Sequence, residues 1–104
     1  MNEFYQKLTQ IRHYLHQHPE LSLEEYETTR RIKEILKREN IEILDVPLKT
    51  GVVAVIRGQE SGPVVAIRGD IDALPVYEET NLSYKSKVDG KMHACGHDYH
   101  LTSI

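Results

Sequence analysis

The period of the apolar residues changes once in this chain of 104 residues, at about Asn40. Residues 4–15 and 26–36 place apolar side chains three or four positions apart, the spacing of helices with one buried face. Residues 51–57 and 64–68 are instead rich in β-branched side chains, which is typical of strands. A chain that passes from helices to strands in this way is expected to have an α/β fold.

Local signals predict where the helices begin and end. The first helix should end before His18-Pro19, because proline disfavours helical geometry in the residue before it. Ser22 and Glu25 have the spacing of a capping box, which predicts a second helix from there to about Asn40. A further helix is expected near Tyr99, with His97 or Asp98 as its cap.

The strand pattern predicts a mixed sheet that is incomplete. Residues 58–63 form a short turn-like link, so residues 51–57 and 64–68 are expected to pair as an antiparallel hairpin. The continuous apolar run at 64–67 predicts burial on both faces, although two helices can cover only one side well. The isolated chain is therefore expected to be marginally stable or oligomeric. Residues 72–92 should be mostly irregular.

The composition excludes several classes of protein. A formal net charge of −3, with both signs interspersed, gives no reason to expect a nucleic-acid or membrane partner. The charged face of the second helix is expected to be merely solvated. A single cysteine cannot form an intrachain disulfide, and the chain has no long apolar run. These features predict a cytoplasmic protein.

Residues 92–100 combine a thiol, three imidazoles and a carboxylate. Cys95 and His97 are two positions apart, so at the end of an extended segment they can point to one side, and Gly96 lets the backbone bend between them. A thiolate and a neutral imidazole are ligands that suit Zn²⁺, and also Mn²⁺, Co²⁺ or Ni²⁺. Cys95 and His97 are therefore the predicted metal ligands.

A second cluster of donors follows the strand pattern at 64–68. Asp70 and Asp72 lie on alternate residues at its end, where open α/β sheets commonly bind ligands. His93, Asp98 and His100 are further possible donors, and the two histidines are equally compatible with supporting or surface roles.

Two other interpretations of the cysteine remain open from the residues alone. Cys95 and His97 are compatible with a non-catalytic metal-binding or interaction module. They are also compatible with a thiol hydrolase in which Cys95 is the nucleophile, although that mechanism needs a third, orienting group.

Three segments in order resemble the N-terminal part of the N-acyl-amino-acid amidohydrolases. These segments are residues 15–22 (LHQHPELS), 68–75 (RGDIDALP) and 90–98 (GKMHACGHD). The group includes hippurate hydrolases, N-acetyldiaminopimelate deacetylases and auxin-conjugate hydrolases, which are relatives of aminoacylase-type zinc metallopeptidases.

The resemblance implies a metal-dependent hydrolase that cleaves small N-acyl amino acids with a metal-activated water. Cys95 and His97 match two ligands of a centre that holds two divalent ions. Asp72 matches a carboxylate that supports a metal ligand, and Asp70 stands where distant relatives have a metal-binding histidine. Asp72 and Asp70 are thus the residues expected to be catalytic.

The resemblance also implies that residues 1–104 are the N-terminal portion of a metallopeptidase-type catalytic domain. The family's glutamate pair, its later histidine ligands and its lid domain, which serves in dimerisation, have no counterpart here. The parent enzyme is expected to be a homo-oligomer, and the 104-residue chain is expected to be inactive by itself.

Overall fold

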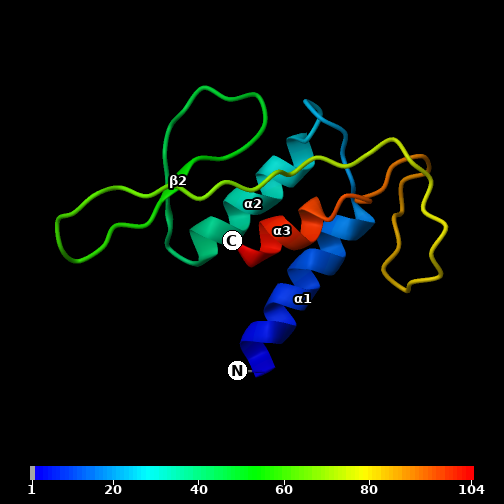
Figure 1. Ribbon diagram of the computed structural model, residues 1–104, viewed down its shortest axis with the longest axis horizontal. Coiled ribbons are helices and arrows are strands. Elements are labelled where there is room, and N and C mark those ends of the chain that lie inside the picture. The colour runs from blue at the N-terminus through cyan, green and yellow to red at the C-terminus, as the bar shows by residue number, and fades with distance from the viewer. Residues whose placement is uncertain (1) are drawn as a thin grey trace.

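The computed structural model describes residues 2–104 as three helices and two short strands joined by long loops. In chain order the elements are α1 (Asn2–Gln17), α2 (Tyr26–Arg38), β1 (Glu42–Ile43), β2 (Ala54–Val55) and α3 (His97–Ser103). Helices combined with an antiparallel pair of strands confirm the predicted α/β class. Figure 1 shows the helices gathered in the centre and loops that reach out on both sides.

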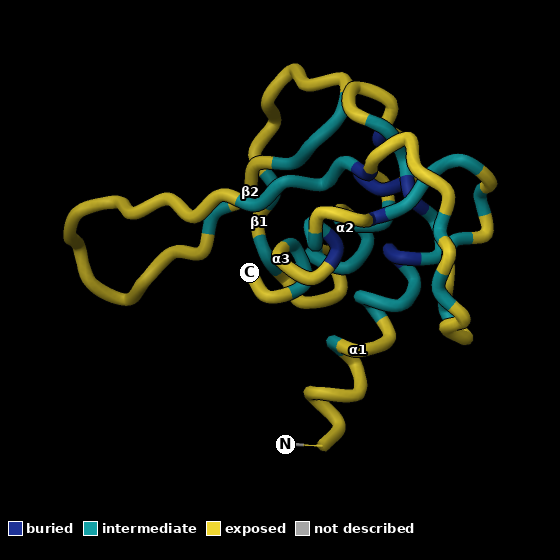
Figure 2. The backbone as a smooth tube through the Cα atoms, turned by 45° about the vertical axis from the view of Figure 1, so that its right-hand side comes forward, coloured by how far each residue is buried: buried dark blue, intermediate teal, exposed yellow. Residues whose placement is uncertain are grey.

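Helix α1 packs against α3 through its C-terminal half. It ends at Gln17, as the His18-Pro19 pair predicted. Leu15 is only 3% exposed, whereas Phe4, in the first turn of the same apolar stripe, is 61% exposed. In Figure 2 the N-terminal part of α1 accordingly projects from the body. The helix that the apolar spacing predicted is therefore confirmed, but only the C-terminal end of its apolar stripe is buried.

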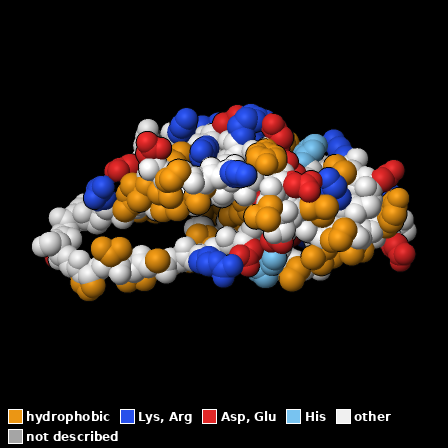
Figure 3. All heavy atoms as spheres, turned by 90° about the horizontal axis from the view of Figure 1, so that it is seen from above, with side chains coloured by type: hydrophobic (Ala, Val, Ile, Leu, Met, Phe, Trp, Pro, Cys, Tyr) orange, Lys and Arg blue, Asp and Glu red, His pale blue; other side chains and the backbone are white. Residues whose placement is uncertain are grey.

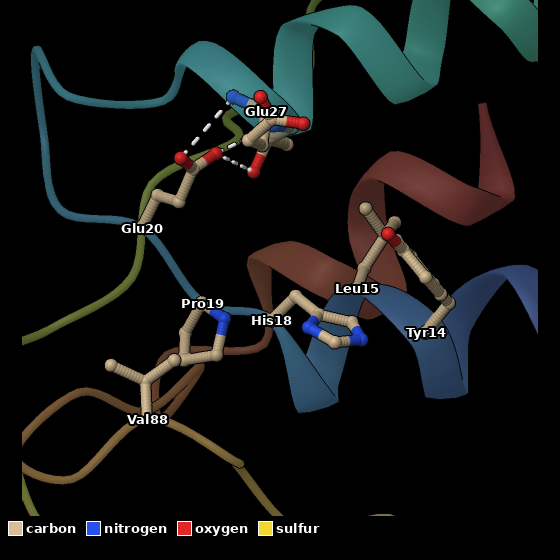
Figure 4. Close-up of a pocket in the computed structure, with 8 residues that line it drawn as sticks. Tyr14, Leu15, His18, Pro19, Glu20, Glu27 and Val88 are labelled. Carbon is tan, nitrogen blue, oxygen red and sulfur yellow. Dashed lines mark hydrogen bonds between the residues drawn. The ribbon is translucent and has the colours of Figure 1, made fainter.

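Helix α2 begins at Tyr26, and its cap is not the predicted one. Ser22 lies in a turn, and the structure gives it no capping hydrogen bond. The Glu20 carboxylate instead accepts hydrogen bonds from the backbone N–H of Thr28 at 2.5 Å and from its hydroxyl at 2.6 Å (Figure 4). These bonds satisfy a donor that the first turn of a helix leaves free. The chain turns away after Arg38, where Asn40 adopts a left-handed φ of 57°.

The predicted hairpin between residues 51–57 and 64–68 is wrong. Within the described residues, the strand in the first of these segments is β2, and it pairs with β1 in the antiparallel register Glu42↔Val55 and Ile43↔Ala54. The prediction failed because it paired the two most apolar runs, whereas the actual partner is β1, a shorter segment that precedes both of them. Residues 64–68 belong to no strand.

The predicted burial of residues 64–67 is also wrong. Val64, Val65 and Ile67 are 94%, 83% and 77% exposed. They lie on an arm, residues 56–68, that projects from the helices and carries apolar side chains on its limbs but not at its tip (Figure 3). Strand propensity reflects the fit of a side chain to a packed surface, and no described element supplies that surface here.

The loop of residues 75–91 is irregular, as predicted, and docks on the end of α1. The N–H of Lys87 donates to the Gln17 carbonyl at 2.9 Å, and the Tyr84 ring stacks on His13 with centroids 3.7 Å apart. Isolated bridges pair Leu21 with Ala73 and Leu74 with Met92. These contacts bring the segment before the loop and the segment after it to the same side of α1.

The interior formed by α1, α3 and the loops is polar. Leu15, Pro19 and Ala73 are its buried apolar side chains among residues 2–104. The buried polar side chains are His16, Glu25, Thr28, Thr29, His93 and Asp98. Such an interior is stable only where its polar groups find hydrogen-bond partners. None of the helices in residues 2–104 has both the length and the apolar character needed to span a membrane.

Candidate metal centre

His97 is the best-oriented of the predicted metal ligands. Its Nδ1 lies 2.9 Å from the Asp72 carboxylate and 3.0 Å from the Asp72 carbonyl oxygen. Both are acceptors, so Nδ1 carries the proton and donates it. The other nitrogen, Nε2, is then free to ligate a metal, which is the usual way that a carboxylate orients a metal-binding histidine.

Asp70 lies on the Nε2 side of the same imidazole. One of its oxygens is 3.8 Å from His97 Nε2, too far for a hydrogen bond, and the other accepts a hydrogen bond from Arg68 at 2.6 Å. The Asp70 side chain is 41% exposed. The structure thus brings together His97, Asp72 and Asp70, three of the four residues predicted for the site.

Gly96 sets the direction in which α3 begins. Its φ of 90° and ψ of 10° are left-handed, a conformation that glycine adopts without steric cost. The N-cap of α3 is Gly96. The prediction that His97 or Asp98 would be the cap is wrong. This turn places His97 in the first turn of the helix.

Cys95, the other predicted ligand, is a free and exposed thiol. Across residues 2–104, no three His, Cys, Asp or Glu side chains lie close enough together to hold an ion. The chemistry of the donors nevertheless fits a divalent metal, because an accessible thiol stands two residues from an imidazole that a carboxylate orients. Cys95 and His97 would be the residues to hold it.

The two flanking histidines have opposite environments. His93 is 5% exposed, and neither of its ring nitrogens has a hydrogen-bond partner among residues 2–104. Burial is the main reason that the pKa of His93 is lowered; the Asp98 carboxylate opposes this effect. His100 is exposed, with its ring centroid 6.1 Å from that of His97. The structure shows no donor role for either.

A network of ionisable side chains lies beside His97, buried except for Arg12, which is 27% exposed, and the sequence pattern did not predict it. Asp98 Oδ2 accepts a hydrogen bond from Arg12 Nε at 2.9 Å and another from His16 Nδ1 at 2.8 Å. The other nitrogen of His16 lies 2.9 Å from Glu78 Oε1. We call Arg12, His16, Glu78 and Asp98 the buried quartet. A sequence signal existed, since Arg12 and His16 are four residues apart on one face of α1.

Glu78 is held as a carboxylate by several donors. Burial raises its pKa, but hydrogen bonds from the Thr80 hydroxyl, the Ser86 N–H and His16 outweigh burial and lower the pKa below its ordinary value. Its side chain is 2% exposed and that of His16 is 3% exposed. The loop of residues 75–91 thus contributes a fixed charge to the interior.

A separate shallow cavity of about 240 Å³ lies between the end of α1 and the start of α2 (Figure 4). Its lining residues are Tyr14, Leu15, His18, Pro19, Glu20, Glu27, Thr28 and Val88. Burial, together with the charges of Lys87 and Arg31, lowers the pKa of His18. None of the lining residues belongs to the predicted metal site.

Several known proteins are similar to this chain in sequence. Residues 66–104 match the model of peptidase family M20/M25/M40. An N-acetylcysteine deacetylase of Bacillus subtilis is 63% identical over 102 residues, which are 97% of this chain and 27% of that protein. A second B. subtilis protein, N-acetyl-L-cysteine deacetylase, is 55% identical over 98 residues, which are 94% of this chain and 24% of that protein.

A solved structure from Bacillus subtilis has the same fold. It is a dinuclear metal-binding peptidase of the M20 family, is 61% identical, and superposes with a TM-score of 0.99 over 100% of this chain and 30% of that one. The chain spans about a quarter of the length of the curated relatives it matches. The predicted correspondence to the N-terminal part of such a peptidase domain is thereby confirmed.

Proposed function

We propose, on the premise that this chain is a relative of the M20/M25/M40 peptidases, that it provides metal ligands for the hydrolysis of small N-acylated amino acids. The observation that carries the proposal is the hydrogen bond from His97 Nδ1 to Asp72, because it leaves Nε2 free for a metal. The names of the related deacetylases support an N-acetyl amino acid, such as N-acetylcysteine, as the substrate class. The reaction is the cleavage of a linear amide.

Each residue of the site has a distinct role in this proposal. Cys95, as a thiolate, and His97, through Nε2, are the ligands of a divalent ion. Asp72 holds the His97 ring in the required tautomer, and Asp70 adds negative charge on the ligand side. A bound divalent ion polarises a carbonyl oxygen and lowers the pKa of a coordinated water. The dinuclear metal binding of the M20 relative supports a centre with two ions.

We expect metal binding without turnover from the 104-residue chain itself. A catalytic zinc takes about three protein ligands and an open position, whereas residues 2–104 contain no cluster of three donor side chains. Acetate release from N-acetylcysteine, measured with Zn²⁺, Mn²⁺, Co²⁺ or Ni²⁺ added, should stay at the rate of the metal alone. Release that requires metal and is abolished in Cys95→Ser would contradict this expectation.

Cobalt provides the direct test of the ligands. Titration of the purified chain with Co²⁺ should produce a thiolate-to-cobalt absorption band that is absent in Cys95→Ser and weakened in His97→Ala. His18→Gln is the matched control, because His18 lies in the separate cavity and should leave the band unchanged. A wild-type chain without this band, or a band that persists in Cys95→Ser, would exclude Cys95 as a ligand.

A second candidate is a non-catalytic metal-binding module, which the exposed thiol of Cys95 and the Asp72-oriented ring of His97 favour. A folded monomer that retains one zinc ion per chain through gel filtration would support it. Loss of the metal on the column would favour a centre that needs further ligands.

A further inference from the structure

We infer that the buried quartet positions His97 for metal binding, with Asp98 as the residue that transmits its effect to the helix. The inference rests on the proposed function, in which His97 is a metal ligand. Within residues 2–104, the hydrogen bonds of Arg12, His16 and Glu78 do not include His97. They act through Asp98, so all four are positioning residues.

Asp98 ties the first turn of α3 to the interior. It follows His97 directly, is 1% exposed, and receives hydrogen bonds on Oδ2 from two side chains of α1. Neighbouring residues on an α-helix point about 100° apart around its axis. When Asp98 is fixed against α1, the rotation of this turn is fixed as well, and the His97 ring is directed toward Asp72.

The helix cannot supply this orientation by itself. Helix α3 has seven residues, and isolated helices of that length are unstable in water. It is joined to the chain before it by Gly96, which is left-handed and the most conformationally permissive residue type. The orientation of the first turn must therefore come from contacts, and the hydrogen bonds of Asp98 are the buried ones that reach α1.

The quartet places two nitrogen-bearing side chains against two carboxyl groups, which makes its geometry specific. The His16 ring lies between them, with Nδ1 2.8 Å from Asp98 Oδ2 and Nε2 2.9 Å from Glu78 Oε1. Arg12 Nε donates to the same Asp98 oxygen at 2.9 Å. Removal of one hydrogen-bond partner leaves a buried polar group unsatisfied, and such groups move to find new partners.

The inference is tested in the 104-residue chain with Asp98→Asn and Glu78→Gln. Glu25→Gln is the matched control, because Glu25 is also a buried carboxylate but lies before α2, with no bond to the quartet. Circular dichroism checks that each variant is folded. Nitrogen-15 spectra of the His97 ring in the metal-free chain report its tautomer, and competition with a chelating dye reports zinc affinity.

We expect the wild-type chain and Glu25→Gln to show the His97 ring as one tautomer, protonated on Nδ1. In Asp98→Asn and Glu78→Gln the ring should exchange between tautomers, and zinc affinity should fall about tenfold or more, as for other groups that orient a metal ligand. Glu78→Gln is the sharper variant, because Glu78 bonds His16 and lies on a different segment from His97. An effect of Glu78→Gln could not be explained by Asp98 acting as a metal ligand itself.

An unchanged His97 tautomer in folded Glu78→Gln and Asp98→Asn overturns the inference. If Asp98→Asn does not fold, Glu78→Gln alone decides. If the wild-type chain binds no zinc, the proposed function fails, but the ring spectra still show whether the quartet positions His97. A similar loss of ring order in Glu25→Gln would mean that any buried charge has this effect, which also overturns the inference.

Discussion

At the scale of single residues, the metal site depends on one backbone conformation that residues other than glycine rarely adopt. Gly96 is left-handed, and a methyl group at this position would lie 3.4 Å from the His100 ring. Alanine there meets both backbone strain and a close contact. The position therefore requires glycine for a geometric reason, and the two ligands on either side depend on it.

We predict that Gly96→Ala lowers the free energy of unfolding by about 1–3 kcal/mol, the cost of a left-handed non-glycine residue. Urea denaturation followed by circular dichroism measures the change. Gly58→Ala is the matched control, because a methyl group at Gly58 would meet no atom within 4 Å and the φ of Gly58 is not positive. Equal effects of the two substitutions would show that the turn at Gly96 is not restrictive.

Much of the site could be predicted from residue types, but not all of it. The structure brings His97 together with Asp70 and Asp72, as the sequence predicted, although residues 64–68, the strand that was expected to carry the two aspartates, belong to no strand. That Asp72 would support a metal ligand came only from the resemblance, and its hydrogen bond to the His97 ring came from the structure. The buried quartet was not predicted because its members are spread from Arg12 to Asp98, and periodicity describes only neighbours in sequence.

At the scale of elements, the helices were more predictable than the strands. A helix satisfies most of its own hydrogen bonds, so the local spacing that predicted α1 and α2 was sufficient. A strand needs a partner, and the sequence does not say which segment that is. β2 pairs with β1, whereas the pattern favoured residues 64–68. The prediction of the α2 cap was wrong for a similar reason. The carboxylate that caps the helix belongs to Glu20, which lies eight residues before Thr28.

We predict that Glu20→Ala destabilises the chain by about 0.5–2 kcal/mol, the usual cost of losing a helix N-cap. The two bonds to Thr28 and one from the Glu27 N–H would be lost. Ser22→Ala should change stability little, although Ser22 is the cap that the sequence indicates. Thermal unfolding of both variants gives the comparison. A larger loss of stability in Ser22→Ala than in Glu20→Ala would show that Ser22 is the cap, as the capping-box spacing predicted.

At the scale of the whole molecule, stability depends on contacts that join the two ends of the chain. His16, near the end of α1, bonds Glu78 in the loop and Asp98 in α3. Because the apolar interior is small, these polar contacts supply stability that a larger apolar core supplies in other domains. The unfolding of the chain should therefore respond to pH.

We predict that stability falls in acid through Glu78. Its pKa is lower in the folded than in the unfolded state, so the unfolded chain binds the extra proton. Its stabilising contribution is present above the unfolded pKa of about 4.3 and is lost as the pH falls through the lower folded value. Urea denaturation from neutral pH to about pH 3 measures this slope.

Two variants separate Glu78 from the other carboxylates. Glu78→Gln should be less stable than the wild-type chain at neutral pH and should lose less stability in acid. Glu79→Gln, at the exposed neighbouring position, should keep the wild-type slope. If Glu78→Gln and the wild-type chain had the same slope, the lowered pKa of Glu78 would not be a source of stability.

The projecting arm of residues 56–68 gives proteases a site where the chain can be cut without entering the body. A nick near its tip, between Gly58 and Gly62, would separate α1, α2 and both strands from the loop and α3. The pairs Arg12–Asp98 and His16–Glu78 cross that division. The two peptides should therefore stay associated, and the arm is the natural place to split this chain into complementing fragments or to insert a label.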